Sequence, residues 1–247
     1  MPEGFRRWFE AFVQTNPCAV VSGGSWDRVS AQLGPVVVRH LQRVYVCNGN
    51  EMRENGQVRY RRPCRLPTAL ALALQNEACA LPALPPELQA VLGAPLRPWL
   101  EQRAGMATLS WLPLQASTLQ RVAFERWDAQ AGVRHELAAD LSRRFEGWRI
   151  QPAGQTSLDV FEQGADKSQV HLFEGPGPLW LVADAITPYG NDWTLAQALR
   201  ARQDGSRAFK VAGWEQTRQL LEAWVQKSAL QPGAKTLRAK AALYTLR

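Results

Sequence analysis

Residues 157–192 read SLDVFEQGADKSQVHLFEGPGPLWLVADAITPYGND. The apolar run Leu179–Ala183 predicts a buried strand that ends directly at Asp184. The glycine turn that follows presents Asn191 and Asp192. Carboxylate and amide oxygens at the end of a strand suit Mg²⁺, which usually binds one or two carboxylates and leaves its other positions to water and phosphate. The stretch therefore predicts an α/β fold with a magnesium site at a strand end.

A lysine and a second glycine turn add features that suit phosphate. Lys167 follows a glycine in the same stretch and would offset phosphate charge. Near the N-terminus, the apolar run Cys18–Val21 leads into Gly23-Gly24-Ser25 and then a helical pattern. The free N–H groups of a helix N-terminus bind phosphate well, although a plain turn with a capping serine explains the same residues. Together these features predict phosphoryl transfer.

Composition favours a soluble globular protein. The 247 residues are 46% hydrophobic and 21% charged, which suits one large domain or two small ones. No apolar run is long enough to span a membrane, and the N-terminus lacks a signal-peptide pattern, so we expect a cytoplasmic protein without a membrane partner. The net charge of +7 is spread along the chain and does not favour a nucleic-acid partner. We expect the tail, residues 235–247, to be a solvated helix or a frayed end.

The order of patterns predicts a core with an insertion. An amphipathic helix at 3–15 precedes the first strand, and Asn55-Gly56 indicates a hairpin with its return strand near Val58. Composition changes at 62–66, where we expect a domain junction. We expect core segments at 1–62 and 160–247, and an α+β insertion with an antiparallel sheet at 63–159. Within the insertion we expect strands at 105–112 and 121–127 and a helix at 136–145.

Three motifs carry a resemblance to a known family. SGGSWDRVSAQLG, SLDVFEQGADKS and ADAITPYGND, in this order and spacing, resemble the eukaryotic-type phosphomannomutases of the haloacid dehalogenase (HAD) superfamily. The resemblance covers about residues 17–221. It implies a HAD-like core with a parallel sheet, an inserted α+β cap, and Mg²⁺-dependent phosphoryl transfer on a phosphorylated sugar.

The resemblance also implies roles for residues of the core. Lys167 would steady the phosphorylated group, Asp184 would bind Mg²⁺, and Asn191 and Asp192 would hold the ion and its waters. The turn after the first strand would bind the transferring phosphoryl group through Ser25, or alternatively Ser22, together with Gly24.

In the cap, the resemblance implies that four residues grip the sugar phosphate: Arg103, Arg121, Ser157 and Asp159. Arginine suits a distal phosphate because its fork is planar and always charged. The resemblance also implies a homodimer that forms through the cap.

One departure from the family is the missing DxDxT motif, which follows the first strand and supplies the nucleophile. The first aspartate of this chain is Asp27, beyond the glycine turn. The missing strand lies in the middle of the family's sheet, so its loss would leave buried backbone groups unpaired, at a cost of about 1–3 kcal/mol each. We therefore expect roughly 15–30 further residues upstream, which mass spectrometry of the native protein would check.

A second departure lies in the cap, where Leu114 replaces a phosphate-gripping arginine. A mutase must hold a bisphosphorylated intermediate, whereas a phosphatase holds one phosphate and admits water. The loss favours a phosphatase, or a mutase with an altered substrate. The alternative is a catalytically inactive HAD-fold protein that binds a sugar phosphate or a partner.

Overall fold

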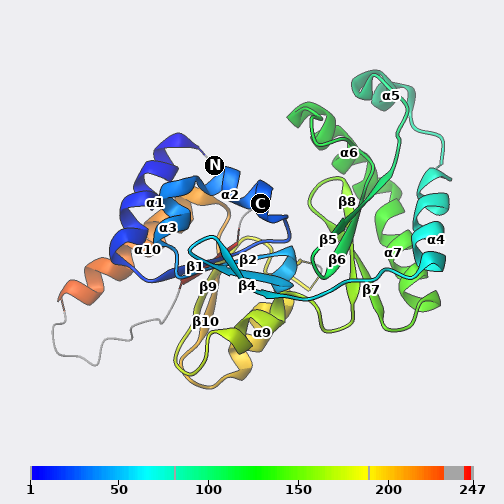
Figure 1. Cartoon of the computed structure of the whole chain (residues 1–247). Coiled ribbons are helices and arrows are strands. Elements are labelled where there is room, and N and C mark those ends of the chain that lie inside the picture. Colours follow the sequence, from blue (N-terminus) through cyan, green and yellow to red (C-terminus); the bar gives the residue numbers. More distant parts are fainter. Residues whose placement is uncertain (1, 81, 189, 231–241, 246–247) are drawn as a thin grey trace. The chain divides into compact units, whose positions relative to one another are not determined.

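The computed structural model describes residues 2–80, 82–188, 190–230 and 242–245. It contains two compact units, which we call the core unit (residues 1–61 and 164–247) and the cap unit (residues 62–163). The core unit holds a seven-stranded mixed sheet, and the cap unit a four-stranded sheet (Figure 1). The predicted α/β fold with an antiparallel second sheet is confirmed.

The core sheet has the strand order β10-β9-β11-β1-β2-β3-β4. Its first five strands are parallel, and β3 and β4 extend the sheet in antiparallel pairing. The strands are β1 (Cys18–Val21), β2 (Arg43–Val46), β3 (Glu51–Glu54), β4 (Gln57–Arg61), β9 (Trp180–Ala183), β10 (Arg207–Lys210) and β11 (Ala242–Thr245).

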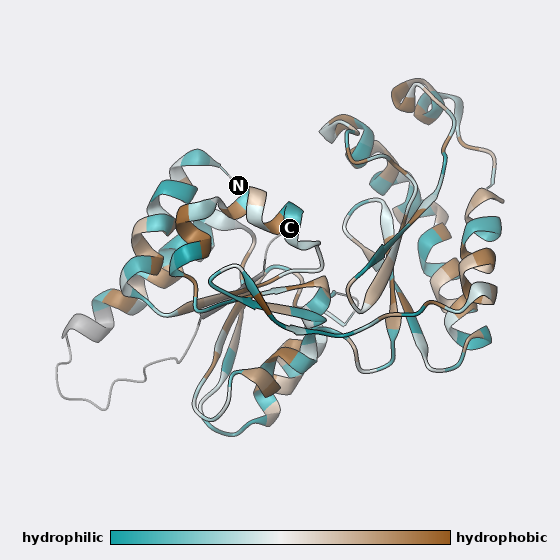
Figure 2. Cartoon of the chain, in the orientation of Figure 1, coloured by the Kyte–Doolittle hydropathy of each residue, from teal (hydrophilic) through white to brown (hydrophobic). Residues whose placement is uncertain are grey.

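Helices cover both faces of the core sheet. In Figure 1, α1, α3 and α10 lie together on one face, and α9 lies on the other. Hydrophobic and hydrophilic residues alternate around these helices (Figure 2), as expected for helices with one face on a sheet. None of the described helices is long and apolar enough to cross a membrane. The elements are α1 (Glu3–Thr15), α2 (Trp26–Leu33), α3 (Pro35–His40), η1 (Cys47–Gly49), η2 (Lys167–Gln169), α8 (Val170–Phe173), α9 (Trp193–Ala201) and α10 (Trp214–Leu230).

The centre of the core sheet corrects two expectations. The strand β11 lies between β1 and β9 and pairs in parallel with both. The expectation that a missing middle strand leaves its neighbours unpaired is therefore wrong here, because residues 242–245 fill the position between β1 and β9. The expectation of a solvated helix or frayed end is wrong for residues 242–245, while residues 235–241 and 246–247 lie outside the described part.

The hairpin predicted at Asn55-Gly56 is confirmed. Its strands β3 and β4 pair in antiparallel fashion, and Asn55 and Gly56 have positive φ angles of 51° and 76°. Positive φ at both central residues matches the twist of the flanking strands. The hairpin forms the edge of the core sheet.

A partly buried polar network ties β2 to the loop before β9. The Tyr45 hydroxyl donates to Glu174 Oε1 at 2.6 Å, and Arg43 Nη1 lies 3.3 Å from Glu174 Oε2. Arg43 Nε also donates to Glu54 at 2.9 Å. Burial and the neighbouring Glu174 carboxylate raise the pKa of Tyr45 well above its usual range, so the phenol stays protonated and remains a donor.

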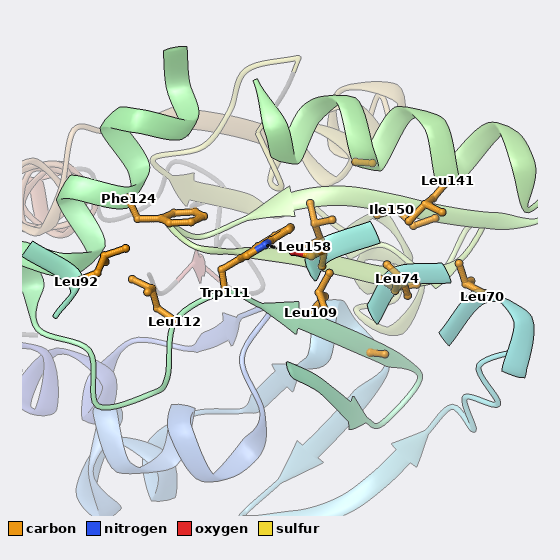
Figure 3. Close-up of a cluster of buried hydrophobic side chains, with 14 of the residues drawn as sticks. Leu70, Leu74, Leu92, Leu109, Trp111, Leu112, Phe124, Leu141, Ile150 and Leu158 are labelled. Atoms are coloured by element: carbon orange, nitrogen blue, oxygen red, sulfur yellow. Dashed lines mark hydrogen bonds between the residues drawn. The ribbon is translucent and has the colours of Figure 1, made fainter. Parts of the chain in front are cut away.

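The cap unit packs helices on one face of its sheet, whose strand order is β5-β6-β8-β7. The buried side chains of Leu109, Trp111, Phe124 and Leu158 gather between the helices and this sheet (Figure 3), and the Trp111 indole donates to the Ala78 carbonyl at 3.2 Å. The elements are α4 (Thr68–Cys79), α5 (Pro86–Leu92), β5 (Trp99–Arg103), β6 (Met106–Ser110), α6 (Thr118–Ala131), α7 (Val133–Arg144), β7 (Trp148–Ala153) and β8 (Ser157–Glu162).

The strand expected at 121–127 is wrong, because these residues lie in α6. A capping box begins this helix: the Ser117 hydroxyl accepts from the Gln120 backbone N–H, and the Gln120 side chain accepts from the Ser117 N–H. These two hydrogen bonds satisfy orphan donors of the first turn and favour the helix over a strand.

Candidate functional site

Lys167 and Asp192 form a buried ion pair in the core unit. Lys167 Nζ donates to Asp192 Oδ1 at 2.7 Å, and the side chains are 2% and 1% exposed. Lys167 begins η2, and Asp192 is the residue just before α9. The pair therefore joins two loops that are 25 residues apart in sequence. The pair thus holds the Lys167 ammonium beside the residue that precedes α9.

Asp184 and Asn191 lie on the turn between β9 and Asp192. Asp184 follows the last residue of β9 and is half-buried, as is Asn191. The turn requires glycine at Gly190, because a Cβ atom there would lie 1.9 Å from the Ala185 carbonyl oxygen. The predicted strand that ends at Asp184 and the glycine turn after it are thus both present.

The turn after β1 and Asp184 both lie at the carboxyl ends of the parallel strands, on the same side of the core sheet. Ser22 is buried, and its hydroxyl accepts from the Gly24 N–H at 3.1 Å. Ser25 is half-buried at the N-cap position of α2, and its side chain forms no capping hydrogen bond. β1 and β9 are separated by β11, so their carboxyl ends lie about 10 Å apart, two strand spacings.

The oxygen ligands at the carboxyl end of β9 fit a magnesium ion. Asp184 supplies a carboxylate and Asn191 an amide oxygen, both half-buried and on one turn. One carboxylate with water and phosphate oxygens is a usual magnesium environment. The structure shows Asp192 as the partner of Lys167, so one of its oxygens is already taken. No cluster of three or more His, Cys, Asp or Glu residues suited to a metal occurs within the described ranges.

A buried amide cluster, missed in the sequence, joins the turn after β2 to the segment that carries Lys167. Asn50 Nδ2 donates at 2.8 Å to the carbonyls of both Cys47 and Ala165. Gln169 Nε2 donates at 3.1 Å to the Asn48 carbonyl and to Asn50 Oδ1. These bonds fasten the turn after β2 to the residues on both sides of Lys167. The spacing Asn48-Gly49-Asn50 gave only a turn signal, since the partners lie more than 110 residues away.

The close packing of these two turns also explains Gly49. Its φ is +84°, and a Cβ atom there would lie 2.8 Å from Val170 Cγ2. Positive φ is a conformation that glycine adopts without a steric penalty. A larger residue would push η1 away from the segment that carries Lys167.

We expect Asn50→Ala to lower the free energy of unfolding of the core unit by about 1–3 kcal/mol, because the buried carbonyls of Cys47 and Ala165 lose their donor. Urea denaturation followed by circular dichroism measures the change. Gln57→Ala, on the exposed edge strand β4, is the matched control and should stay within about 0.5 kcal/mol of the parent. Equal stability of the two variants would show that the hydrogen bonds of Asn50 to Cys47 and Ala165 do not stabilise the core unit.

Three of the four cap residues share one face of the cap sheet. Thr108 pairs with Asp159 and Ser110 pairs with Ser157, and their hydroxyls link them: Thr108 Oγ1 donates to Asp159 Oδ1 and Ser157 Oγ to Ser110 Oγ, each at 3.1 Å. Arg103, at the end of β5, shares this face by register and pairs with Glu101. We call these residues the polar sheet face. They alternate with the apolar residues that contact the helices.

Arg121 lies elsewhere in the cap unit. It is on α6, and its guanidinium donates to the carbonyls of Pro113, Leu114 and Ala116 at 2.8–3.2 Å. Leu114, at the position where the resemblance implied an arginine, is 51% exposed. The structure therefore shows Arg121 as a support of this loop, and its role toward a sugar phosphate stays a prediction.

A buried ion pair that the sequence did not reveal supports the polar sheet face. Arg134 Nε donates to Asp128 Oδ2 at 2.7 Å, and the Arg134 backbone N–H donates to Asp128 Oδ1. Arg134 Nη1 also reaches the carbonyls of Gly154 at 3.1 Å and Ser157 at 3.3 Å. The pair thus joins the α6–α7 turn to the start of β8, where Ser157 lies.

Known proteins of similar sequence are phosphomannomutases. The sequence pattern of the eukaryotic phosphomannomutase family matches residues 6–224. A phosphomannomutase of Galdieria sulphuraria is 29% identical over 192 residues, which are 73% of this chain and 72% of that protein. A phosphomannomutase of Spinacia oleracea is 26% identical over 186 residues, with 72% of each chain covered.

Solved structures share the fold. A haloacid dehalogenase-like hydrolase from Bacteroides thetaiotaomicron superposes with a TM-score of 0.52 at 11% identity, over 88% of this chain and 90% of that one. An IMP-nucleotidase from Plasmodium falciparum gives 0.50 at 12% identity over 90% of this chain, which spans 62% of the nucleotidase. At these identities the likeness shows a HAD-type fold.

Proposed function

Because the chain belongs to the eukaryotic phosphomannomutase family, we propose that it carries out Mg²⁺-dependent phosphoryl transfer on a hexose phosphate, as a phosphatase or a mutase. The observation that carries the proposal is the buried pair between Lys167 of η2 and Asp192, which ends the turn that follows Asp184. Phosphoryl transfer needs mainly positioning and charge neutralisation. The Lys167 ammonium and the oxygen atoms of Asp184 and Asn191 would supply this positioning and this charge neutralisation.

The residues that follow β9 and those that follow β1 have different roles in this proposal. Asp184 and Asn191 would hold the magnesium ion, which when bound neutralises charge on the phosphoryl oxygens. Lys167 would offset the remaining charge from the interior side. The Ser25 hydroxyl and backbone N–H groups of the turn that contains Gly24 would donate hydrogen bonds to the phosphoryl group from the carboxyl end of β1.

The polar sheet face would recognise the rest of the substrate. Arg103 would bind a distal phosphate, and its pairing with Glu101 would hold the guanidinium in place. Ser157 and Asp159 would bind sugar hydroxyls through their oxygen atoms.

Whether the protein has a residue that accepts the phosphoryl group decides between phosphoryl transfer and a second candidate function. The family resemblance implies an aspartate at the end of the central strand. Here the strand between β1 and β9 reads Ala-Leu-Tyr-Thr and contains no carboxylate. This observation favours, as the second candidate, a protein that binds a sugar phosphate with Mg²⁺ without transferring the phosphoryl group.

We expect Asp184→Asn to reduce magnesium-dependent turnover of mannose or glucose phosphates by at least about 100-fold, since a metal ion supplies several kcal/mol of charge stabilisation and each 1.36 kcal/mol is tenfold. Phosphate release and sugar isomer conversion, with and without a hexose bisphosphate, measure the activity. Asp140→Asn, in the cap unit with a side chain 41% exposed, is the control and should match the parent.

Calorimetry on the same proteins separates the two candidates. Turnover by the parent protein that Asp184→Asn removes supports phosphoryl transfer. Magnesium-dependent binding of mannose 6-phosphate with no turnover supports the second candidate. If neither turnover nor binding depends on Asp184, the metal assignment is wrong.

A further inference from the structure

We propose that the C-terminal strand β11 organises the phosphate site. It lies between β1, which leads into the phosphoryl-binding turn, and β9, which leads into Asp184. The position of the strand follows from the sheet alone. Its effect on phosphate binding rests on the proposed function. β11 lies beyond residue 224, where the match to the family pattern ends.

The register of β11 connects the first and the later part of the core unit. Ala242 pairs with Cys18 of β1 and with Trp180 of β9, and Tyr244 pairs with Val20 and Val182. The whole pairing is parallel on both sides. Within the described residues β1 and β9 have no direct pairing with each other, so β11 makes the sheet continuous.

The two neighbours of β11 lie in the interior. All residues of β1 are buried, and Leu181, Val182 and Ala183 of β9 are at most 1% exposed. Buried backbone N–H and C=O groups in native proteins are almost always paired. Without β11, one edge of β1 and one edge of β9 would face the interior with these groups unpaired.

The carboxyl ends of the flanking strands carry the two halves of the site. Val21, which pairs with Thr245, is followed by Ser22 and the turn with Ser25. Ala183 is followed by Asp184. Since β11 spaces these two ends, it sets the distance between the phosphoryl-binding turn and the proposed magnesium ligands. Loss of β11 would therefore remove phosphate binding together with the sheet.

Hydrogen exchange on the intact protein tests the position of the strand. We expect the amides of residues 242–245 to exchange at rates within about tenfold of those of β1, since both open in the same cooperative event. Exchange of residues 242–245 at the rate of an unfolded peptide, while β1 stays protected, would overturn the proposal.

A proline variant tests the link to the site. Tyr244→Pro removes an N–H and fixes φ, which a central strand does not tolerate, while Tyr244→Val keeps a strand-forming residue as the control. We expect the proline variant to lose the melting transition of the core unit or, where it stays folded, to lose the melting-temperature shift produced by inorganic phosphate with Mg²⁺. The valine variant should keep both.

The outcomes distinguish this inference from the proposed function. A proline variant that melts and responds to phosphate like the parent overturns the role of β11. A parent protein whose residues 242–245 are protected but which shows no phosphate shift refutes the proposed phosphate site, and leaves β11 as the central strand.

Discussion

Replacing Lys167 with methionine is expected to lower the free energy of unfolding of the core unit by about 3–5 kcal/mol, because it leaves the Asp192 carboxylate buried without its partner. The volume of the side chain is nearly kept, so the loss comes from the charge and not from a cavity. Urea denaturation monitored by far-ultraviolet circular dichroism measures the change. The same variant should lose the proposed phosphoryl transfer, since the Lys167 ammonium no longer offsets the phosphate charge that Mg²⁺ leaves.

A double variant separates stability from activity. Lys167→Met with Asp192→Leu replaces both buried charges by apolar groups, which is often close to neutral for stability. We expect it to recover most of the lost stability but none of the activity. Lys210→Met, on an exposed residue of β10, is the control and should change stability by less than about 0.5 kcal/mol. A Lys167→Met variant as stable as this control would show that the pair is not buried in solution.

The parts of the site that lie on one continuous stretch could be predicted from the sequence. The strand that ends at Asp184 and the glycine turn that leads to Asn191 follow from an apolar run and from local turn chemistry. The partnership of Lys167 with Asp192 could not be predicted in the same way. It depends on the distance between two loops, and periodicity reports which residues share a face of one element but not which loops meet.

The amide cluster around Asn50 was out of reach for the same reason. Its partners Ala165 and Gln169 lie on the far side of the inserted cap unit in sequence. The sequence shows polar residues near a turn, and only the fold makes them buried donors to specific carbonyls. Polar residues that position a site are therefore harder to predict than the apolar residues that form its strands.

The errors in secondary structure had different causes. For α6, the segment Arg121–Trp127 contains aromatic and β-branched residues, which favour a strand. A helix signal was nevertheless present in the pattern Ser117-Thr118-Leu119-Gln120, a capping box. For β11, four residues carry no period that distinguishes a strand, and its pairing with residues more than 200 positions away cannot be seen locally.

Replacing Arg134 with leucine is expected to lower the free energy of unfolding of the cap unit by about 3–5 kcal/mol. Asp128, 2% exposed, would remain as a buried charge without a partner, and the Gly154 and Ser157 carbonyls would lose a donor. Because these carbonyls lie where β8 begins, we also expect weaker binding of the sugar phosphate. Thermal unfolding and calorimetric titration with mannose 6-phosphate measure the two effects.

Arg143→Leu provides the matched control, because this arginine is on the same helix but its side chain is 71% exposed and pairs only at the surface. It should leave both stability and binding within error of the parent. Arg134 lies wholly within the cap unit, which has its own apolar core around Trp111. The core-unit transition, followed through the protection of β1 amides, should therefore persist at concentrations of urea that unfold the cap of Arg134→Leu. If both units unfold together in this variant, the two cores are not independent, and the division at residues 62 and 163 does not describe cooperative units of folding.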